Sequence, residues 1–386
     1  MRSDSAGIYV HVPFCSAICP YCDFAVTVGK AEARARFVRN LLAEIDTFAT
    51  AGAAWLDGAD TIYFGGGTPS ALEPAQIDEI LGHIRERLPI ADDPWIFLEA
   101  NPEDTNPETC AAWRASGVRT LSLGLQSTID PDLRFLGRRH HRESAIESIE
   151  AARHAGFATL SLDLMYALPD QDDARWTRQL DDIVALEPDH VSCYQLTIHD
   201  GTHFGKLAEA GRLAEMPDDA QRTLFERTHR RLAEAGIPGY EVSNFARSLE
   251  HHSRHNRKYW YHVPYLGLGP SAHSFDGASR WWNRRDTNAW GDAIERGDSP
   301  VEERESLTAS DLALEAVMLG LRTYDGIDLA HLSSRFGLDL VAPNQELLEA
   351  LAKEAVANVD GARIRPTIGG LAIADTLARR VTIPSA

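Results

Sequence analysis

Cysteine is scarce in this sequence, with 5 residues in a chain of 386. A secreted disulfide scaffold uses cysteine far more densely, so that class of protein is excluded. The first residues, Met1 to Gly7, lack the apolar core of a signal peptide, and we therefore expect a cytoplasmic protein. No apolar run approaches the roughly 18 residues that a membrane-spanning helix needs.

Basic residues are also in short supply, with 38 Lys and Arg against 57 Asp and Glu and a formal net charge of −19. Such a charge argues against a nucleic-acid partner held through its phosphates. Hydrophobic residues make up 44% of the chain, which is enough for a packed core. The length fits one large domain followed by a small one.

The sequence does contain a dense cysteine run near its start. Cys15, Cys19 and Cys22 form a C-x3-C-x2-C pattern with no fourth cysteine nearby. Three thiolates can bind three irons of a cubic [4Fe–4S] cluster and leave the fourth iron open to an outside ligand. A structural zinc site and a disulfide with a spare thiol are the alternatives. The other two cysteines, Cys110 and Cys193, fall in a helical pattern and an apolar strand, and we interpret them as buried and inert.

Apolar runs alternate with amphipathic segments over the first 240 residues. Strands are expected at 8–12, 61–64, 96–100, 120–125, 159–165 and 191–197. Helices are expected at 31–49, 74–88, 107–116, 143–155, 174–186 and 218–235. Strands that alternate with helices predict an α/β fold with a parallel sheet and its helices packed outside. Because six such units are too few for a closed eight-stranded barrel, we expect a partial (β/α)6 barrel.

Polar and glycine-rich elements fall at the carboxyl ends of these six expected strands. They are the cysteine loop, Gly65-Gly66-Gly67-Thr68-Pro69, Glu99 with Asn101, Gln126, Asp163 and Thr197. The carboxyl ends of parallel strands meet on one face, where barrel enzymes build their sites. Turns collect glycine and carboxylates in any protein, so one such loop would mean little. Six such elements, each at the carboxyl end of its strand, predict a functional site on that face.

The alternation is lost past residue 240. The segment 243–265 is rich in His, Arg and aromatic residues and includes His255-Asn256-Arg257-Lys258-Tyr259-Trp260. An imidazole beside aromatics and cations can ligate haem iron, whereas the alternative is a solvated basic loop over the barrel mouth. His140 and His141 are interpreted as surface residues. The charged stretch 297–307, which carries Pro300, is expected to be a linker.

A helical pattern resumes at Thr308 and continues in shorter elements to the C-terminus. We expect there a small, mainly helical, winged-helix-like domain. The expected division is therefore a barrel over 1–242, an extension covering it over 243–299, and a C-terminal domain over 300–386.

The cysteine run, with Tyr21 just before Cys22, resembles the signature of radical S-adenosylmethionine (SAM) proteins. The flanking segments 9–15 and 19–24 resemble a narrower group within them. That group holds the oxygen-independent coproporphyrinogen III oxidases (HemN) and the haem chaperones (HemW). The similarity extends to the tail, at 315–322. It implies a [4Fe–4S] cluster, bound SAM and a flavodoxin-like or ferredoxin-like reductant.

The resemblance also implies individual roles. Gly66, Gly67 and Thr68 would meet the methionine end of SAM, and Glu99 would pair with its ammonium group. Further contacts would come from Gln126, Arg139, Asp163 (ribose), Tyr9 and Tyr21, with Thr197 and His273 as weaker matches. Each of these, taken singly, is just as typical of an ordinary surface or core position. His255 belongs to an H-N-x-x-Y-W motif that is linked to haem in the chaperone branch.

Two departures separate the sequence from the oxidase branch. Oxidases have a fourth cysteine two residues beyond the third, where this sequence has Phe24. They also have a long segment before the first strand, which here is expected to begin by Ile8. We therefore expect a haem chaperone that passes haem to an acceptor such as a respiratory haemoprotein, with membrane association only through that acceptor. The alternatives are oxidative decarboxylation of coproporphyrinogen III and a radical-SAM reaction on another substrate.

Overall fold

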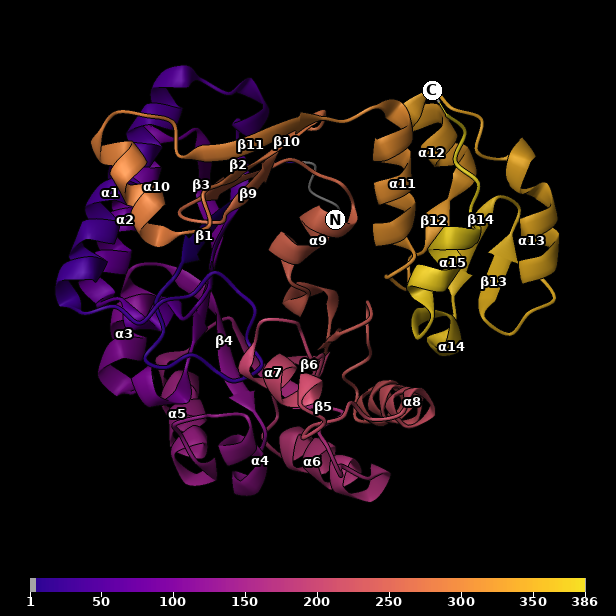
Figure 1. Ribbon diagram of the computed structural model, residues 1–386, viewed down its shortest axis with the longest axis horizontal. Helices are drawn as coiled ribbons and strands as arrows, with labels where there is room; N and C mark the ends of the chain where they lie inside the picture. The colour runs from indigo at the N-terminus through magenta and orange to yellow at the C-terminus, as the bar shows by residue number, and fades with distance from the viewer. Residues whose placement is uncertain (1–4, 386) are drawn as a thin grey trace.

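The computed structural model describes residues 5–385, in which a large sheet carries helices on its outer side and a smaller C-terminal unit lies beside it (Figure 1). The sheet has 11 strands in the order β11-β10-β9-β8-β1-β2-β3-β4-β5-β6-β7. Its parallel part consists of β1 (Gly7–Val12), β2 (Ala59–Gly66), β3 (Ile90–Ala100), β4 (Val118–Gln126), β5 (Thr159–Tyr166) and β6 (His190–Gln195). In the described chain β6 does not pair with β1, so the curved sheet stays open. The predicted partial (β/α)6 barrel is confirmed.

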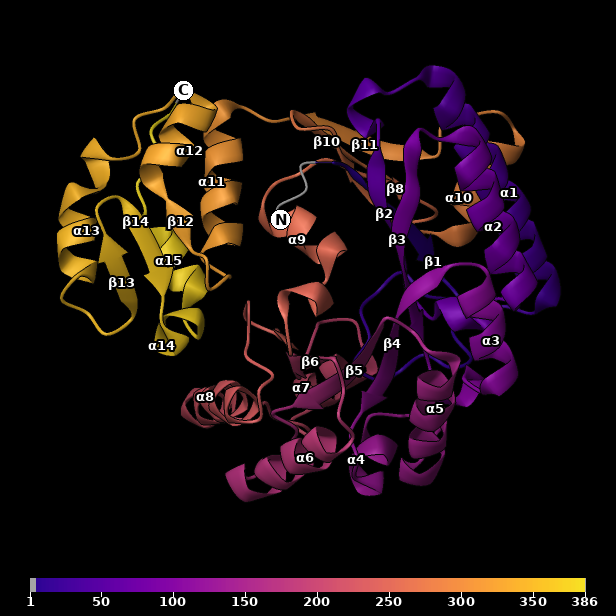
Figure 2. The same cartoon turned by 180° about the vertical axis from the view of Figure 1, so that it is seen from behind.

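Six helices cover the outer face of this parallel part, seen from both sides in Figures 1 and 2. They are α1 (Ala31–Ala51), α2 (Pro74–Arg87), α3 (Pro107–Ala115), α5 (Arg142–Ala155), α6 (Asp173–Ala185) and α8 (Asp218–Glu234). Local sequence sets their ends: the side chain of Asn106 accepts from two backbone amides at the start of α3, and Gly156 ends α5 in the left-handed conformation. Two shorter helices, α4 (Asp130–Phe135) and α7 (His203–Glu209), were not expected from the sequence.

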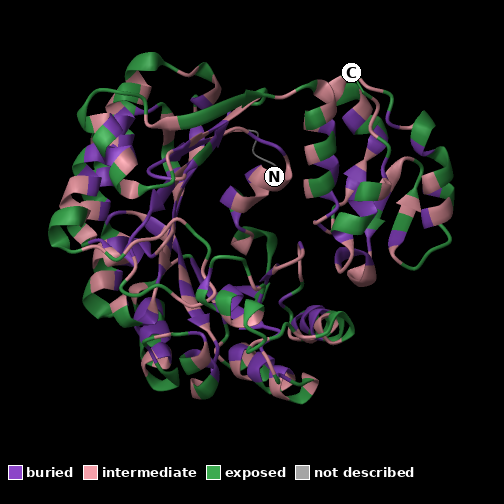
Figure 3. Ribbon diagram, viewed as in Figure 1, coloured by how far each residue is buried: buried purple, intermediate pink, exposed green. Residues whose placement is uncertain are grey.

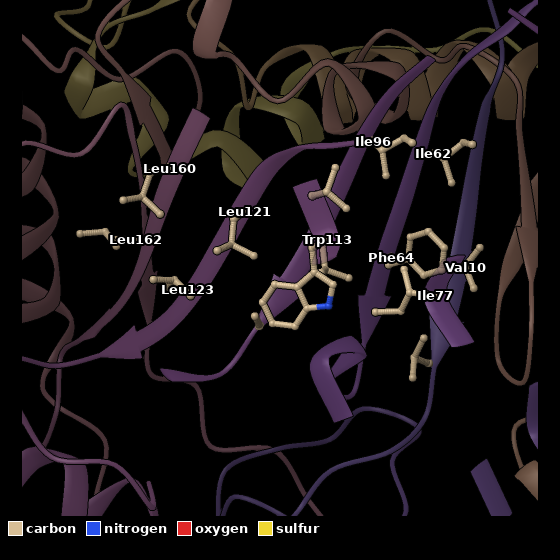
Figure 4. Close-up of a cluster of buried hydrophobic side chains, with 14 of the residues drawn as sticks. Val10, Ile62, Phe64, Ile77, Ile96, Trp113, Leu121, Leu123, Leu160 and Leu162 are labelled. Atoms are coloured by element: carbon tan, nitrogen blue, oxygen red, sulfur yellow. The ribbon is translucent and has the colours of Figure 1, made fainter. Parts of the chain in front are cut away.

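The side-chain period of two divides each strand between the core and the barrel interior. Leu121, Leu123, Leu160 and Leu162 point to the helices and pack with Trp113 of α3, as Figure 4 shows. Their sequence neighbours therefore face inward. This alternation places polar residues of β3, β4 and β5 inside the barrel, near the carboxyl ends of the strands. The inward set includes Glu99, Ser122, Gln126 and Asp163.

The chain after the sixth parallel strand widens the sheet at both edges. One short strand, β7 (Asn244–Ala246), pairs antiparallel with β6. Helix α9 (Arg254–Trp260) follows, and β8 (Tyr265–Leu268) then pairs parallel with β1. Antiparallel pairing continues through β9 (His273–Phe275), β10 (Ser279–Asn283) and β11 (Val301–Ser306), with α10 (Thr287–Glu295) packed on α1.

The linker expected over 297–307 was wrong for the residues of β11. Five of its six residues are exposed, and three of them are glutamates. A charged, solvated strand at the edge of a sheet lacks the apolar alternation that marks a half-buried strand, and its charges discourage pairing with other chains. The charged composition of β11 is typical of a linker, but in this protein it belongs to an edge strand.

The C-terminal unit has its own hydrophobic cluster, and the buried faces of its helices turn toward one another in Figure 3. It contains α11 (Ala309–Gly320), α12 (Leu329–Phe336), α13 (Gln345–Leu351), α14 (Ile368–Leu371) and α15 (Ala374–Arg380). Three antiparallel strands complete it: β12 (Ile327–Asp328), β13 (Ala357–Asp360) and β14 (Arg363–Pro366). The expected mainly helical, winged-helix-like tail is confirmed. Across residues 5–385, none of the helices combines the length and the apolar character that crossing a bilayer requires.

Candidate functional site

A cavity of about 430 Å³ opens at the carboxyl ends of the six parallel strands, and we name it the first cavity. Every one of the six strands, or the loop after it, supplies part of its wall. The predicted residues that line it are Cys15, Cys19, Tyr21, Cys22, Gly66, Gly67, Thr68, Glu99, Gln126, Asp163 and Thr197. The structure thus brings together residues from the ends of six separate strands and the loops after them, as their common position at the strand ends predicted.

The three cysteines lie on the loop between β1 and α1, as half-buried free thiols. The Thr68 hydroxyl donates to Cys15 Sγ at 3.4 Å. Burial raises the pKa of Cys15 to about 11 and also raises the pKa of Cys22. Burial disfavours the charged thiolates, and the positive charge of a metal that displaces the thiol protons would offset that cost.

The donor set fits a [4Fe–4S] cluster better than it fits one ion. Among residues 5–385, no three His, Cys, Asp or Glu side chains converge as the ligands of a single metal ion do. A cube needs no such convergence, because each thiolate binds a different iron. All three thiols also line the same cavity as the glycine loop and Glu99.

The glycines after β2 allow the glycine loop to pack directly on the cysteine loop. A Cβ on Gly67 would lie 2.8 Å from the backbone oxygen of Phe14, and one on Gly66 would lie 2.5 Å from the ring of His11. Gly66 also has a φ of 108°, which side-chain-bearing residues rarely adopt. The glycines therefore hold this backbone at the cavity wall, a closer approach than a plain strand-to-helix turn requires.

Two buried carboxyl groups, Glu99 and Asp163, lie inside the barrel, close enough for the charge of Asp163 to act on Glu99. Tyr63 donates to Glu99 at 2.7 Å, and the Ser122 hydroxyl lies 3.0 and 3.1 Å from the two oxygens of Asp163. Burial raises the pKa of Glu99 to about 7, with the charge of Asp163 adding to the rise, and burial raises the pKa of Asp163 to about 6. Two buried acids that resist ionisation favour a ligand that brings positive charge.

The arginine at this cavity is Arg138, whereas the sequence predicted Arg139. Arg138 donates from Nη2 to Asn101 Oδ1 at 2.6 Å and to the Gly124 carbonyl at 2.9 Å, and from Nη1 to Cys19 Sγ at 3.7 Å. Its buried Nε has no partner within residues 5–385. Arg139 is exposed and lies outside the cavity wall. Asn101, which the sequence placed at the end of the third strand, also lines the wall. Sequence reasoning missed Arg138 and Ser122 as wall residues; of these two, only Ser122 carried a signal, because it shares the inward face of β4 with Gln126.

A second cavity of about 460 Å³ lies beside the first, and the two share the wall residues Asp23, Phe24, Gly66 and Glu99. Its other walls come from β1, α9, β8 and β9 with the loops around them. Those residues are Tyr9, His11, Ala25, Tyr259, Tyr265, Ser271, His273 and Arg285. Of the predicted SAM contacts, Tyr9 and His273 therefore line this second cavity and are absent from the wall of the first.

His255 lies on α9 inside the barrel, fully buried. Thr61 Oγ1 is 2.9 Å from its Nδ1 and the Tyr259 hydroxyl is 2.9 Å from its Nε2. Burial lowers the pKa of His255 to about 3, so the ring is neutral. In this arrangement both ring nitrogens are engaged, and the segment is a packed helix where a solvated loop was the alternative.

The other residues singled out from the sequence divide into confirmed and corrected assignments. Cys110 and Cys193 are buried, as predicted. His140 was expected at the surface but is 5% exposed, with Nε2 at 3.1 Å from the Leu125 carbonyl. The segment after α4 packs against the end of β4, where Arg138 donates to the Gly124 carbonyl and the His140 ring contacts the Leu125 carbonyl.

Comparison with known proteins agrees with this geometry. The radical SAM superfamily matches residues 9–183, and the HemN C-terminal domain matches residues 307–373. "Heme chaperone HemW" of Mycobacterium tuberculosis is 35% identical over 385 residues, covering 98% of this chain and 95% of that protein. The chain belongs to the HemW group of the radical SAM superfamily.

Other members of the HemW group align over similar lengths. "Heme chaperone HemW" of Bacillus subtilis is 32% identical over 351 residues, covering 90% of this chain and 91% of that protein. The solved coproporphyrinogen III oxidase HemN of Escherichia coli superposes with a TM-score of 0.84 over 98% of this chain and 91% of that chain. At 22% identity, that superposition shows a shared fold. The predicted family and architecture are confirmed.

Proposed function

We propose that this protein is a haem chaperone that holds a [4Fe–4S] cluster and SAM in the first cavity and delivers haem to an acceptor haemoprotein. Phe24 supports the proposal most directly. It stands two residues beyond Cys22, where the oxidase pattern has a fourth cysteine, and the residue is 64% exposed on the wall that both cavities share. An apolar ring at this boundary can contact a flat apolar ligand. Unlike the cysteine of the oxidase pattern, it offers no thiol. The relatives named heme chaperones align with almost the whole chain.

The cavity residues divide the task of holding the two cofactors. Cys15, Cys19 and Cys22 would bind three irons of the cluster, and SAM would occupy the space beside Gly66 to Thr68. When bound, the reduced cluster supplies one-electron chemistry to the sulfonium of SAM. Glu99 would pair with the ammonium group of SAM, and Asp163 would accept from the ribose hydroxyls. The positive charge would also relieve the cost of ionising the two buried acids.

The proposed partners follow from these cofactors and from the cargo. A flavodoxin-like or ferredoxin-like protein would supply electrons to the half-buried cysteine loop, where Ile18 is 53% exposed beside the cavity. The acceptor would be a respiratory haemoprotein in a cytoplasmic setting, with any membrane contact made through that acceptor.

A paired experiment tests this function. The cluster-loaded protein is titrated anaerobically with haemin while the Soret band is followed, and the complex is then mixed with an apo-haemoprotein. We expect saturable uptake followed by transfer. In parallel, coproporphyrinogen III is incubated with SAM, a low-potential reductant and the same protein. Formation of protoporphyrinogen would overturn the proposal in favour of the oxidase. Absence of haem uptake would also overturn it, without selecting the oxidase.

A further inference from the structure

The inside of the barrel next to the first cavity is lined by small polar side chains. The leucines of β5 point outward to the helices in Figure 4, so Ser161 and Asp163, which alternate with them, point inward. Ser161 is in register with Ser122 of β4 on one side and with His190 of β6 on the other. Large branched apolar residues usually fill the inside of a parallel barrel. This interior has instead a row of hydroxyl and imidazole groups beside a buried acid.

Asp163 is surrounded by hydroxyl groups that can donate to it. The hydroxyl of Ser122 lies 3.0 and 3.1 Å from its two oxygens. Ser192 and Ser161 also hydrogen-bond to Asp163, and these three bonds hold its pKa below the value that burial alone would give. A hydroxyl has this effect only while its proton points at the carboxyl group. The groups that set the direction of these protons therefore influence the charge of Asp163.

The direction of the Ser161 proton is set by a chain of three further groups. Ser161 Oγ lies 2.8 Å from Nδ1 of His190, and Nε2 of that ring lies 2.8 Å from the Tyr240 hydroxyl. The Tyr240 oxygen accepts from the backbone amide of Ser253 at 3.0 Å, and within residues 5–385 the hydroxyl has no acceptor other than His190. Because a tyrosine hydroxyl has one proton, Tyr240 donates it to Nε2. The proton of the ring then lies on Nδ1 and is donated to Ser161, which donates its own to Asp163.

The chain is buried, and its imidazole is neutral. His190 is 5% exposed, and burial lowers its pKa to about 3, with the charges of His252 and His251 adding to the fall. The neutral ring has a single proton, which lies on one of its two nitrogens. Tyr240 stacks on the ring of His252 with centroids 3.9 Å apart and planes at 13°. The cavity lined by Ser161 and His190 has a volume of about 30 Å³, which admits water and no larger molecule.

Other titratable groups face the chain from the neighbouring elements. The positive charge of Arg138 lowers the pKa of Asp163, and Glu99 lies near enough for Asp163 to act on it. The remaining groups around Asp163 are Tyr63, Cys193 and Tyr194, and those around His190 and Tyr240 are His251, His252, Glu241, Arg257 and Tyr261. All of them are retained in the variants below, so a change in pH dependence reports the hydrogen bond that was removed.

We propose, building on the SAM site proposed above, that Tyr240 and His190 act through Ser161 as positioning residues that keep Asp163 ionised for the two ribose hydroxyls of SAM. An ionised carboxyl group accepts from both hydroxyls, whereas a protonated one carries a proton that it must donate. Without the Tyr240 hydroxyl, the ring can carry its proton on Nε2. Nδ1 then accepts from Ser161, and that hydroxyl turns away from Asp163. The backbone amide at the start of α9 is thereby linked to the ribose end of the SAM site.

The test compares Ser161→Ala, His190→Phe and Tyr240→Phe with the wild type, by calorimetry of SAM binding to the cluster-loaded protein at pH 8 and pH 6. Because burial raises the pKa of Asp163 to about 6, about half of it is ionised at pH 6. Loss of one donor to a charged group raises a pKa by about one unit, which lowers that fraction to about a tenth. Ser161→Ala should therefore bind SAM about fivefold more weakly than the wild type at pH 6, but within about twofold of it at pH 8.

The two indirect variants should show the same pattern with a smaller size. His190→Phe and Tyr240→Phe leave Ser161 in place, so we expect a loss of about two- to threefold at pH 6 and almost none at pH 8. The double variant Ser161→Ala/Tyr240→Phe should match Ser161→Ala alone, because Tyr240 acts through Ser161. Titrations in two buffers of different ionisation enthalpy should show that each single variant releases more protons on binding SAM at pH 6 than the wild type does.

Tyr324→Phe is the matched control. The Tyr324 hydroxyl also meets a buried histidine, at 3.2 Å from Nδ1 of His229, and neither residue lines the first cavity. This variant should bind SAM as the wild type does at both pH values. An equal loss at pH 6 in Tyr324→Phe and Tyr240→Phe would show that the effect is not specific to the chain, and would overturn the proposal.

The remaining outcomes separate this proposal from the function on which it rests. If the wild type binds SAM more weakly at pH 6 than at pH 8 and Tyr240→Phe does the same to the same extent, the SAM site stands and the positioning role is overturned. A loss of equal size at both pH values, or additive losses in the double variant, would overturn that role as well. If the wild type binds no SAM, the proposed SAM site itself fails.

Discussion

The two cavities share a wall but differ in the kinds of side chain that line them. In the first, the acids Glu99 and Asp163 are hydrogen-bonded to Tyr63 and Ser122, and Arg138 is bonded to the wall around it. In the second, aromatic rings dominate, and the exposed imidazole of His273 has no hydrogen-bond partner within residues 5–385. A site whose groups are fixed in advance suits a resident cofactor, because little ordering remains to be done on binding.

The two cavities also differ in which parts of the chain form their walls. The wall of the first cavity comes from the carboxyl-terminal parts of the parallel strands β1 to β6 and from the loops that follow them. The second cavity adds residues from α9, β8 and β9, which follow the repeat. We infer that the segment after residue 243 adapts a general SAM-binding scaffold to a particular ligand.

The largest effect should come from the cysteines, which act only on the first cavity. Replacing Cys15, Cys19 or Cys22 with serine should remove the cluster, because hydroxyls do not replace thiolates as iron ligands. After anaerobic reconstitution, iron and sulfide analysis should fall from about four of each per chain to near zero. Cys110→Ala, a buried thiol of α3, is the matched control and should keep the full content. A full cluster in Cys22→Ser would break the assignment.

The next largest effect should be that of Glu99→Gln on SAM binding. Loss of a charged partner costs about 1.5–3 kcal/mol, or roughly 10- to 100-fold in Kd. Because burial raises the pKa of Glu99 to about 7, the carboxyl is neutral below that pH and ionised above it. The wild-type affinity for SAM should therefore fall as the pH drops through 7, and Asp163, with a pKa of about 6, should extend the fall.

Calorimetry of the cluster-loaded protein at several pH values measures both effects. In Glu99→Gln, the part of the pH dependence near pH 7 should disappear. An affinity for SAM that rises on acidification, or a variant that keeps the full slope, would contradict a pairing between Glu99 and the ammonium group.

Two adjacent arginines offer an internal comparison. Arg138→Ala removes hydrogen bonds to Asn101 and the Gly124 carbonyl, so SAM affinity should fall by about tenfold. Arg139→Ala removes an exposed side chain outside the cavity and should change the affinity by less than about twofold. The same titration decides between them. A larger loss in Arg139→Ala would favour the arginine that the sequence predicts.

The smallest effect should be that of Thr197→Ala. Thr197 lines the first cavity in the loop after β6, and in the described residues its hydroxyl makes no hydrogen bond. Its removal should weaken SAM binding by less than about threefold. Thr47→Ala, on the exposed side of α1, serves as the control and should have no effect. A loss above about tenfold in Thr197→Ala would show that its hydroxyl binds SAM directly.

Most of the parallel barrel could be predicted from the sequence because its signals are local. Buried strands, amphipathic helices and glycine stops at Gly117, Gly156 and Gly236 mark their own positions. The converging loops then follow from geometry, since parallel strands end on one face. Six separated segments could therefore be assigned to one site from the residue pattern alone.

The sequence was least informative where tertiary contacts decide the outcome. Nothing in the dipeptide Arg138-Arg139 tells which side chain turns inward, because the turn after α4 sets that direction. His255 has the composition of a solvated basic segment, but packing against Tyr63 and Thr61 buries it. The charged strand β11 has no apolar alternation and exists through pairing with β10. Each of these depends on a neighbour that is distant in sequence.

The most direct test asks whether the protein binds SAM and haem at the same time. Cluster-loaded protein is saturated with SAM, titrated anaerobically with haemin, and passed through a gel-filtration column, after which both ligands are quantified. The account predicts that the haem-bound fraction retains SAM and that SAM does not lower the haem stoichiometry. Displacement of SAM by haem would contradict it, because the two ligands would then compete for one site.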